Sequence, residues 1–154
     1  MKRKMTWLVL ADGQRARAYR YFGEDQLPEA ETDFEFDHQG VPSRDLMTDE
    51  PGRMQSSTGG GSAAFTPRID PHEQAEERFL DHVAAKLAEA VDAGRCDAVI
   101  LAAPPTALGH LRQKLSSATQ KLLTAEINKD FTKTAVRELG KLVARHLAAR
   151  HAAA

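Results

Sequence analysis

The chain has 154 residues and a formal net charge of −1, with 42% hydrophobic and 28% charged residues. This length and composition indicate one soluble globular domain, and the net charge gives no overall reason to expect binding to nucleic acid. The chain has a single cysteine, Cys96, which excludes an internal disulfide and favours a reducing compartment. Because Cys96 comes just before an apolar run, we interpret it as an inert residue at the edge of the core.

The N-terminal part predicts three strands. An apolar run at residues 5–10 indicates a buried strand, and it is too short for a signal peptide or a membrane span. We therefore expect a cytoplasmic protein without membrane insertion. Asp12-Gly13 is a hairpin signal that leads into a second strand at residues 15–22. A third strand at about residues 27–36 completes an antiparallel meander.

Residues 38–69 show no periodicity and are rich in Gly, Pro, Ser, Thr and Asp, which predicts a long loop. Long loops inside compact domains are usually functional or disordered. Three consecutive glycines, Gly59, Gly60 and Gly61, would allow close backbone approach to a partner. The loop leads directly into a helix start, with Asp70 placed as the N-cap, Pro71 at the first helical position and Glu73 completing a capping box.

The second half predicts alternating helices and strands. The helix opened by Asp70 carries an apolar stripe and ends at Gly94. The elements that follow are a strand covered on both faces (97–103), a helix (106–115), a short helical turn (to 122), a strand (124–128) and a last helix (134–149). We predict one α/β domain over residues 1–154, in which a β-meander and then αβαβα form a mixed five-stranded sheet with helices on both faces.

Charge is distributed unevenly along the chain. Residues 96–154 carry nine Lys or Arg and four Asp or Glu, so this part is positive and the remainder is negative. A basic half could face phosphate groups, although solvated helix faces have the same composition.

Several other patterns argue against enzyme or metal chemistry. The glycine run lacks the lysine of a phosphate-binding P-loop. Asp12 could be a metal carboxylate of a ribonuclease-H-like nuclease, but that chemistry needs several converging carboxylates, so we interpret Asp12 as a turn residue. His72 could join Ser57 or Ser62 in a catalytic triad, but nothing holds these serines against it. The six histidines lack metal-ligand spacing and are interpreted as surface residues, and no metal or cofactor is expected. The histidines are His38, His72, His82, His110, His146 and His151.

Longer segments carry a family resemblance. LVLADGQRARAYRY, GGGSAAF before a long helix, and DAVILAAPPTALGHLR resemble the middle domain of eukaryotic and archaeal class-1 release factors. DPHEQAEERF, DAVILAAPPTALGHLR and AEINKDFT more closely resemble the bacterial host attachment proteins, a family related to that domain. The resemblance covers about residues 5–150 and implies a release-factor middle-domain, ribonuclease-H-like fold. In release factors a Gly-Gly-Gln tip hydrolyses the peptidyl-tRNA ester, whereas Gly61 occupies the glutamine position here.

The resemblance implies a cytoplasmic, translation-linked module that contacts RNA, with the ribosome or tRNA as partner. The predicted contact residues are those of the loop: Arg53, Ser57, Thr58, Gly59, Gly60, Gly61, Ser62 and Arg68. Because no amide side chain remains at the tip, we expect binding rather than catalysis. Two alternatives stay open, namely a peptidyl-tRNA or related ester hydrolase that acts through the same loop and a protein-interaction module whose loop folds on a partner.

Overall fold

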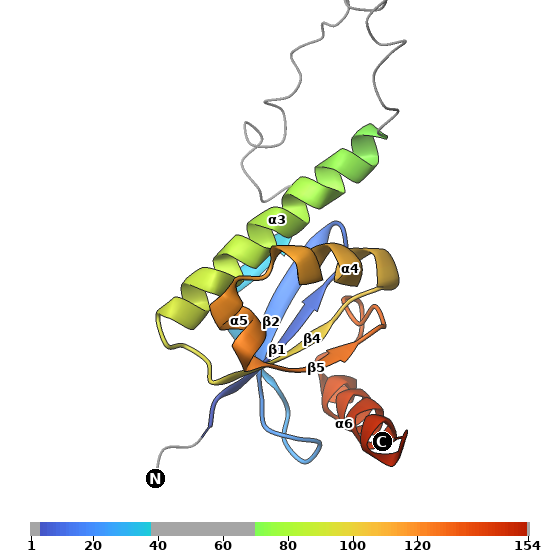
Figure 1. Cartoon of the computed structure of the whole chain (residues 1–154). Helices are drawn as coiled ribbons and strands as arrows, with labels where there is room; N and C mark the ends of the chain where they lie inside the picture. Colours follow the sequence, from blue (N-terminus) through green and yellow to red (C-terminus); the bar gives the residue numbers. More distant parts are fainter. Residues whose placement is uncertain (1–3, 38–69, 154) are drawn as a thin grey trace, which may run out of the picture.

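The centre of the molecule is a five-stranded mixed sheet, seen in a computed structural model that describes residues 4–37 and 70–153 (Figure 1). The strand order across the sheet is β3-β2-β1-β4-β5. β1, β2 and β3 form an antiparallel meander, and β4 and β5 continue the sheet parallel to β1. The strands are β1 (Thr6–Ala11), β2 (Arg15–Tyr21), β3 (Glu29–Asp37), β4 (Ala98–Ala102) and β5 (Leu123–Ile127).

Four helices within the described residues cover the two faces of this sheet (Figure 1). They are α3 (Pro71–Asp92), α4 (Pro105–Lys114), α5 (Ser117–Leu122) and α6 (Val136–Ala153). The predicted order of elements and the single α/β domain with a mixed five-stranded sheet are confirmed. The long loop predicted at residues 38–69 lies outside the described residues.

The alternation of side chains along β1 separates two hydrophobic cores. Trp7 and Val9 point to the face covered by α3, α4 and α5, where Phe79 and Leu111 pack against them. Leu8 and Leu10 point to the opposite face, which α6 covers with Leu139 and Val143. β4 lies between β1 and β5 and is buried along its whole length, as its continuous apolar run predicted.

Some boundaries differ from those predicted by one or two residues. The third strand begins at Glu29 rather than at residue 27, and Leu27 is 60% exposed in the turn before it. α6 begins at Val136 rather than at residue 134, since Thr134 takes part in a turn through its N–H bond to the Phe131 carbonyl. Phe34 of β3 is buried edge-on against Trp7, with ring centroids 5.6 Å apart, so it forms the inward face of this strand.

Candidate functional site

The residues that the sequence proposes as the contact loop all lie between residues 38 and 69, outside the described residues. They are Arg53, Ser57, Thr58, Gly59, Gly60, Gly61, Ser62 and Arg68. The described part of the chain shows the two points that this segment joins, the end of β3 at Asp37 and the residue before α3, Asp70. The assignment of the eight residues therefore stays a prediction.

The start of α3 follows the predicted capping pattern in part. The Asp70 carboxylate accepts a hydrogen bond from the His72 N–H at 2.9 Å, and Pro71 occupies the first helical position. The return bond of a capping box, from the Asp70 N–H to the Glu73 side chain, is not among the hydrogen bonds of the described residues. Glu73 instead lines a cavity beside the helix.

This cavity has a volume of about 660 Å³ and lies where β1 and β4 end. Ligands of α/β proteins commonly bind outside the carboxyl ends of parallel strands, which is the position of this cavity. Its walls come from the β1–β2 turn, the first turns of α3 and one face of α4. The lining residues that carry polar side chains are Asp12, Gln14, Glu73, Glu76, Glu77, Thr106, His110 and Gln113.

Asp12 holds the β1–β2 turn, as predicted. Its Oδ1 accepts hydrogen bonds from the N–H groups of Gln14 at 2.7 Å and Arg15 at 2.8 Å. Its Oδ2 lies 3.1 Å from the hydroxyl of the buried Thr132, which ties the turn to the segment before α6. The described residues contain no group of three or more His, Cys, Asp or Glu that could hold a metal ion.

One histidine in this cavity, His110, is not the surface residue that the sequence predicted. The side chain of His110 on α4 is only 16% exposed, and its Nε2 lies 2.7 Å from Oδ1 of Asp81 on α3. His72 is exposed, as predicted. The spacing of Thr106, His110 and Gln113 by four and three residues places all three on one face of α4, and this is the signal that the sequence interpretation missed.

A basic face runs along α6. Arg137, Lys141 and Arg145 are all exposed and four residues apart, so that they lie along one side of the helix, and Lys133 continues the spacing before it. Among the described residues none of these four has an acidic partner. We call Arg137, Lys141 and Arg145 the α6 basic face.

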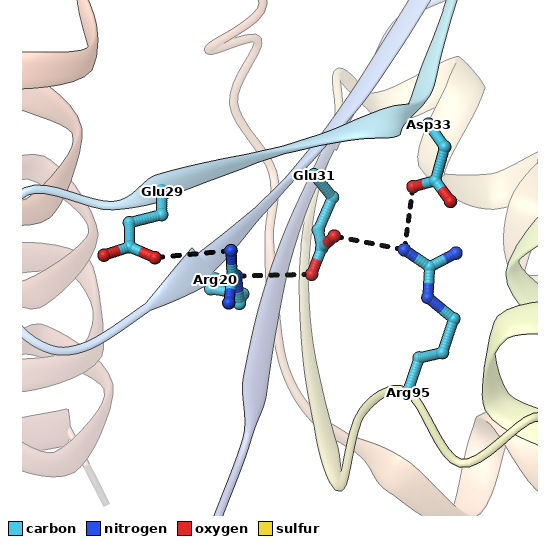
Figure 2. Close-up of polar contacts among 5 residues, drawn as sticks. All are labelled: Arg20, Glu29, Glu31, Asp33 and Arg95. Carbon is cyan, nitrogen blue, oxygen red and sulfur yellow. Dashed lines mark hydrogen bonds and ion pairs between the residues drawn. The ribbon is translucent and has the colours of Figure 1, made fainter.

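The acidic residues of β3, in contrast, are largely paired. Arg95 contacts Glu31 at 3.0 Å and Asp33 at 2.7 Å, and Arg20 lies 3.4 Å from both Glu29 and Glu31 (Figure 2). The Nε of Arg20 is not aligned for a hydrogen bond, so its contact with Glu31 is ionic. These contacts join β2, β3 and the segment after α3, which is a structural role at the edge of the sheet.

Comparison with known proteins identifies the family. The sequence model of a family described as "Protein required for attachment to host cells" matches residues 7–143, most of the chain. No curated protein sequence matches this chain. No helix in the described ranges is long and apolar enough to cross a membrane. The chain belongs to the host attachment protein family.

Proposed function

We propose that this host attachment family protein is a cytoplasmic, translation-linked module that contacts RNA. The observation that carries the proposal is the α6 basic face, which is exposed and has no acidic partner among the described residues. Cationic side chains that are not neutralised by their own protein are available to phosphate groups and bind them by releasing counterions. The resemblance to release-factor middle domains supplies the translation context, and the ribosome or tRNA is the proposed partner.

In this proposal the loop and the α6 basic face contact different parts of one large ligand. α3, which follows the loop, and α6 lie on opposite faces of the sheet (Figure 1). The tip around Ser57–Ser62, flanked by Arg53 and Arg68, would insert into a confined RNA site, and the α6 basic face would anchor the domain on phosphates nearby. A role of the family in attachment to host cells is then indirect, through the proteins whose synthesis the module affects.

The cavity beside α3 is not the proposed RNA contact. Its lining residues include Asp12, Glu73, Glu76 and Glu77 but neither lysine nor arginine. Phosphate groups brought against these carboxylates would be repelled. The charges therefore favour α6 over the cavity as the proposed RNA contact.

The experiment is co-sedimentation of the purified protein with ribosomes and with tRNA across a salt series. We expect association that weakens as salt rises, and a variant with Arg137→Gln, Lys141→Gln and Arg145→Gln should lower the slope of log affinity against log salt by about three. The matched control replaces Lys86, Lys114 and Lys121 by glutamine, which changes the net charge equally on the other face of the sheet. It should behave like the unmodified protein.

Deletion of residues 58–62 tests the loop separately. If the loop inserts into RNA, the deletion lowers affinity at every salt concentration while the salt slope stays close to that of the full chain. No association with ribosomes or tRNA at any salt would overturn the proposal and would direct the search to protein partners of the loop. Cleavage of peptidyl-tRNA that a Gly60→Pro variant abolishes would instead support the ester hydrolase alternative.

A further inference from the structure

The cavity beside α3 is formed by two helix faces that are polar where they oppose each other. The first buried residue of α3 is Phe79, so the first two turns of the helix contribute Glu73, Glu76 and Glu77 to the cavity rather than a core contact. α4 buries Leu108 and Leu111 on its other side and turns His110 toward the same space. Facing helix surfaces normally bury apolar side chains, so this pair of polar faces has no role in building the core.

The His110 ring is held in place by a carboxylate from the opposite helix. Because its Nε2 lies 2.7 Å from Oδ1 of Asp81, the neutral ring donates its Nε2–H to that carboxylate. Nδ1 is then the ring nitrogen with a lone pair and can accept a hydrogen bond from a ligand. A part-buried imidazole in a cavity with a fixed tautomer is an ordered hydrogen-bond acceptor.

The Glu76 side chain packs closely against Gly13 of the β1–β2 turn, and this contact fixes one carboxylate in the cavity wall. A Cβ atom added at Gly13 would lie 2.6 Å from Cδ and 2.8 Å from Oε1 of Glu76, so the Glu76 side chain occupies the space that any other residue at this position would fill. The glycine therefore allows the Glu76 carboxylate to lie against the turn. Leu80 and Ala107 provide the apolar part of the lining.

These observations define the charge of the ligand. The cavity is lined by acidic, amide, hydroxyl and imidazole side chains without a lysine or arginine, which favours a cation and disfavours phosphate. The residues described provide no cluster suited to a metal ion, which favours an organic cation. We propose that the cavity is a binding site for a small primary amine, with the ammonium group against the carboxylates of Glu73, Glu76 and Glu77 and a donor group of the ligand on Nδ1 of His110.

The test is a titration of the full-length ¹⁵N-labelled protein with putrescine at constant ionic strength, monitored by NMR. Separate titrations with inorganic phosphate and with glycerol provide an anionic and a neutral probe. We expect saturable amide shifts at Gly13, Thr106, His110 and Gln113 with putrescine alone. The ¹⁵N shifts of the His110 ring should show the Nε2–H tautomer in the free protein. Asp81→Asn should both change the ratio of the two ring tautomers and weaken putrescine binding.

Three variants separate binding in the cavity from general charge attraction. Replacement of Glu73, Glu76 and Glu77 by glutamine should weaken putrescine binding by about tenfold or more. The control, Glu24→Gln with Asp92→Asn and Glu138→Gln, removes the same charge from exposed positions outside the cavity and should leave binding unchanged. Gly13→Ala keeps the charge but displaces the Glu76 side chain, so it should also weaken binding.

The proposal fails if putrescine produces no saturable shifts, if phosphate shifts the same amides, or if both charge variants lose binding equally. Circular dichroism of each variant confirms that the fold is intact. RNA binding through α6 is independent of these outcomes, because the α6 basic face lies on the other side of the sheet.

Discussion

Cys96 is a residue whose chemistry is strongly changed by its surroundings. Its side chain is buried just before β4, and burial, together with the neighbouring Asp97 carboxylate, raises the pKa of the thiol from 9.0 to about 11. The thiolate is the reactive form, so its population near neutral pH falls by about a hundredfold. We predict that iodoacetamide modifies the native protein at least about a hundredfold more slowly than the urea-unfolded protein. Equal rates, measured by mass spectrometry over time, would show that the thiol is accessible in the native state.

Arg95 links stability to pH through the contacts in Figure 2. Its hydrogen bond to Asp33 holds the pKa of that carboxyl below its ordinary value of 3.8. A lowered carboxyl pKa stabilises the folded state fully above the pKa of the unfolded chain, and this stabilisation is lost as the pH falls through the folded value. Arg95 also lies over the Trp7 ring, with its guanidinium carbon 4.9 Å from the ring centroid.

We therefore predict that Arg95→Met lowers the melting temperature at neutral pH and that this deficit shrinks as the pH falls below about 4. Methionine keeps an unbranched side chain beside Trp7, so the substitution removes mainly the charge and its hydrogen bonds. Thermal melts at a series of pH values measure the effect, with Lys86→Met as the control for loss of a cation on α3. A deficit that stays constant with pH would mean that Arg95 acts through packing on Trp7 and not through Asp33.

Two helical glycines, one in α4 and one in α6, differ in the space around their Cα atoms. A Cβ at Gly109 in α4 would meet no atom within 4 Å. A Cβ at Gly140 in α6 would lie 3.2 Å from the Gly23 carbonyl oxygen and 3.5 Å from that of Gln26. Gly140 thus allows α6 to pack closely on the turn between β2 and β3, whereas Gly109 has no such contact.

From this difference we predict opposite changes in the free energy of unfolding. Gly109→Ala should stabilise the protein by about 0.5–1 kcal/mol, because alanine costs less conformational entropy in a helix. Gly140→Val should destabilise it by about 1–3 kcal/mol, because its branched side chain must displace backbone carbonyls of the turn. Urea unfolding of both variants provides the measurement. A stabilised Gly140→Val protein would show that the turn moves away at little cost.

The elements could be predicted from the sequence because each is specified by local signals. The apolar run at residues 5–10, the Asp70 cap and the helix end at Gly94 are properties of short segments, and these three predicted features are present. Gly94 follows α3 with a φ of 75°. The predicted start of β3 was two residues too early, because Leu27 has the composition of a strand residue but is 60% exposed before the strand begins at Glu29. The turn before β3 packs on Gly140 of α6, and this contact with a distant element cannot be seen in the local sequence.

At the scale of the whole molecule, the cavity depends on elements that are far apart in the sequence. Asp81 and His110 are on different helices, and Asp12 accepts a hydrogen bond from Thr132, which lies 120 residues later in the sequence. The histidines lack metal-ligand spacing along the chain, which favoured a surface residue at position 110, and this spacing carries no information about Asp81 on another helix. A polar face on α4 could be seen from spacing, but its partner on α3 is determined only when both helices pack on the same face of the sheet.

Charge is also separated across the sheet. Residues 70–95, which include α3, carry seven Asp or Glu and three Lys or Arg, whereas the α6 basic face lies on the opposite side. A net charge of −1 therefore conceals an acidic α3 segment and a basic face on α6. Partners that approach from the two sides experience different electrostatic fields, since exposed charges act over roughly a Debye length of 8–10 Å at physiological salt.

We predict that the protein is retained on heparin, a polyanion, in spite of its negative net charge. The variant with glutamine at Arg137, Lys141 and Arg145 should elute at markedly lower salt, because it lacks the cationic surface that faces the matrix. The variant with glutamine at Lys86, Lys114 and Lys121 has the same net charge but keeps that surface, so it should elute close to the unmodified protein. Equal elution of the two variants would mean that retention follows net charge, and the α6 basic face would then have no special part in binding polyanions.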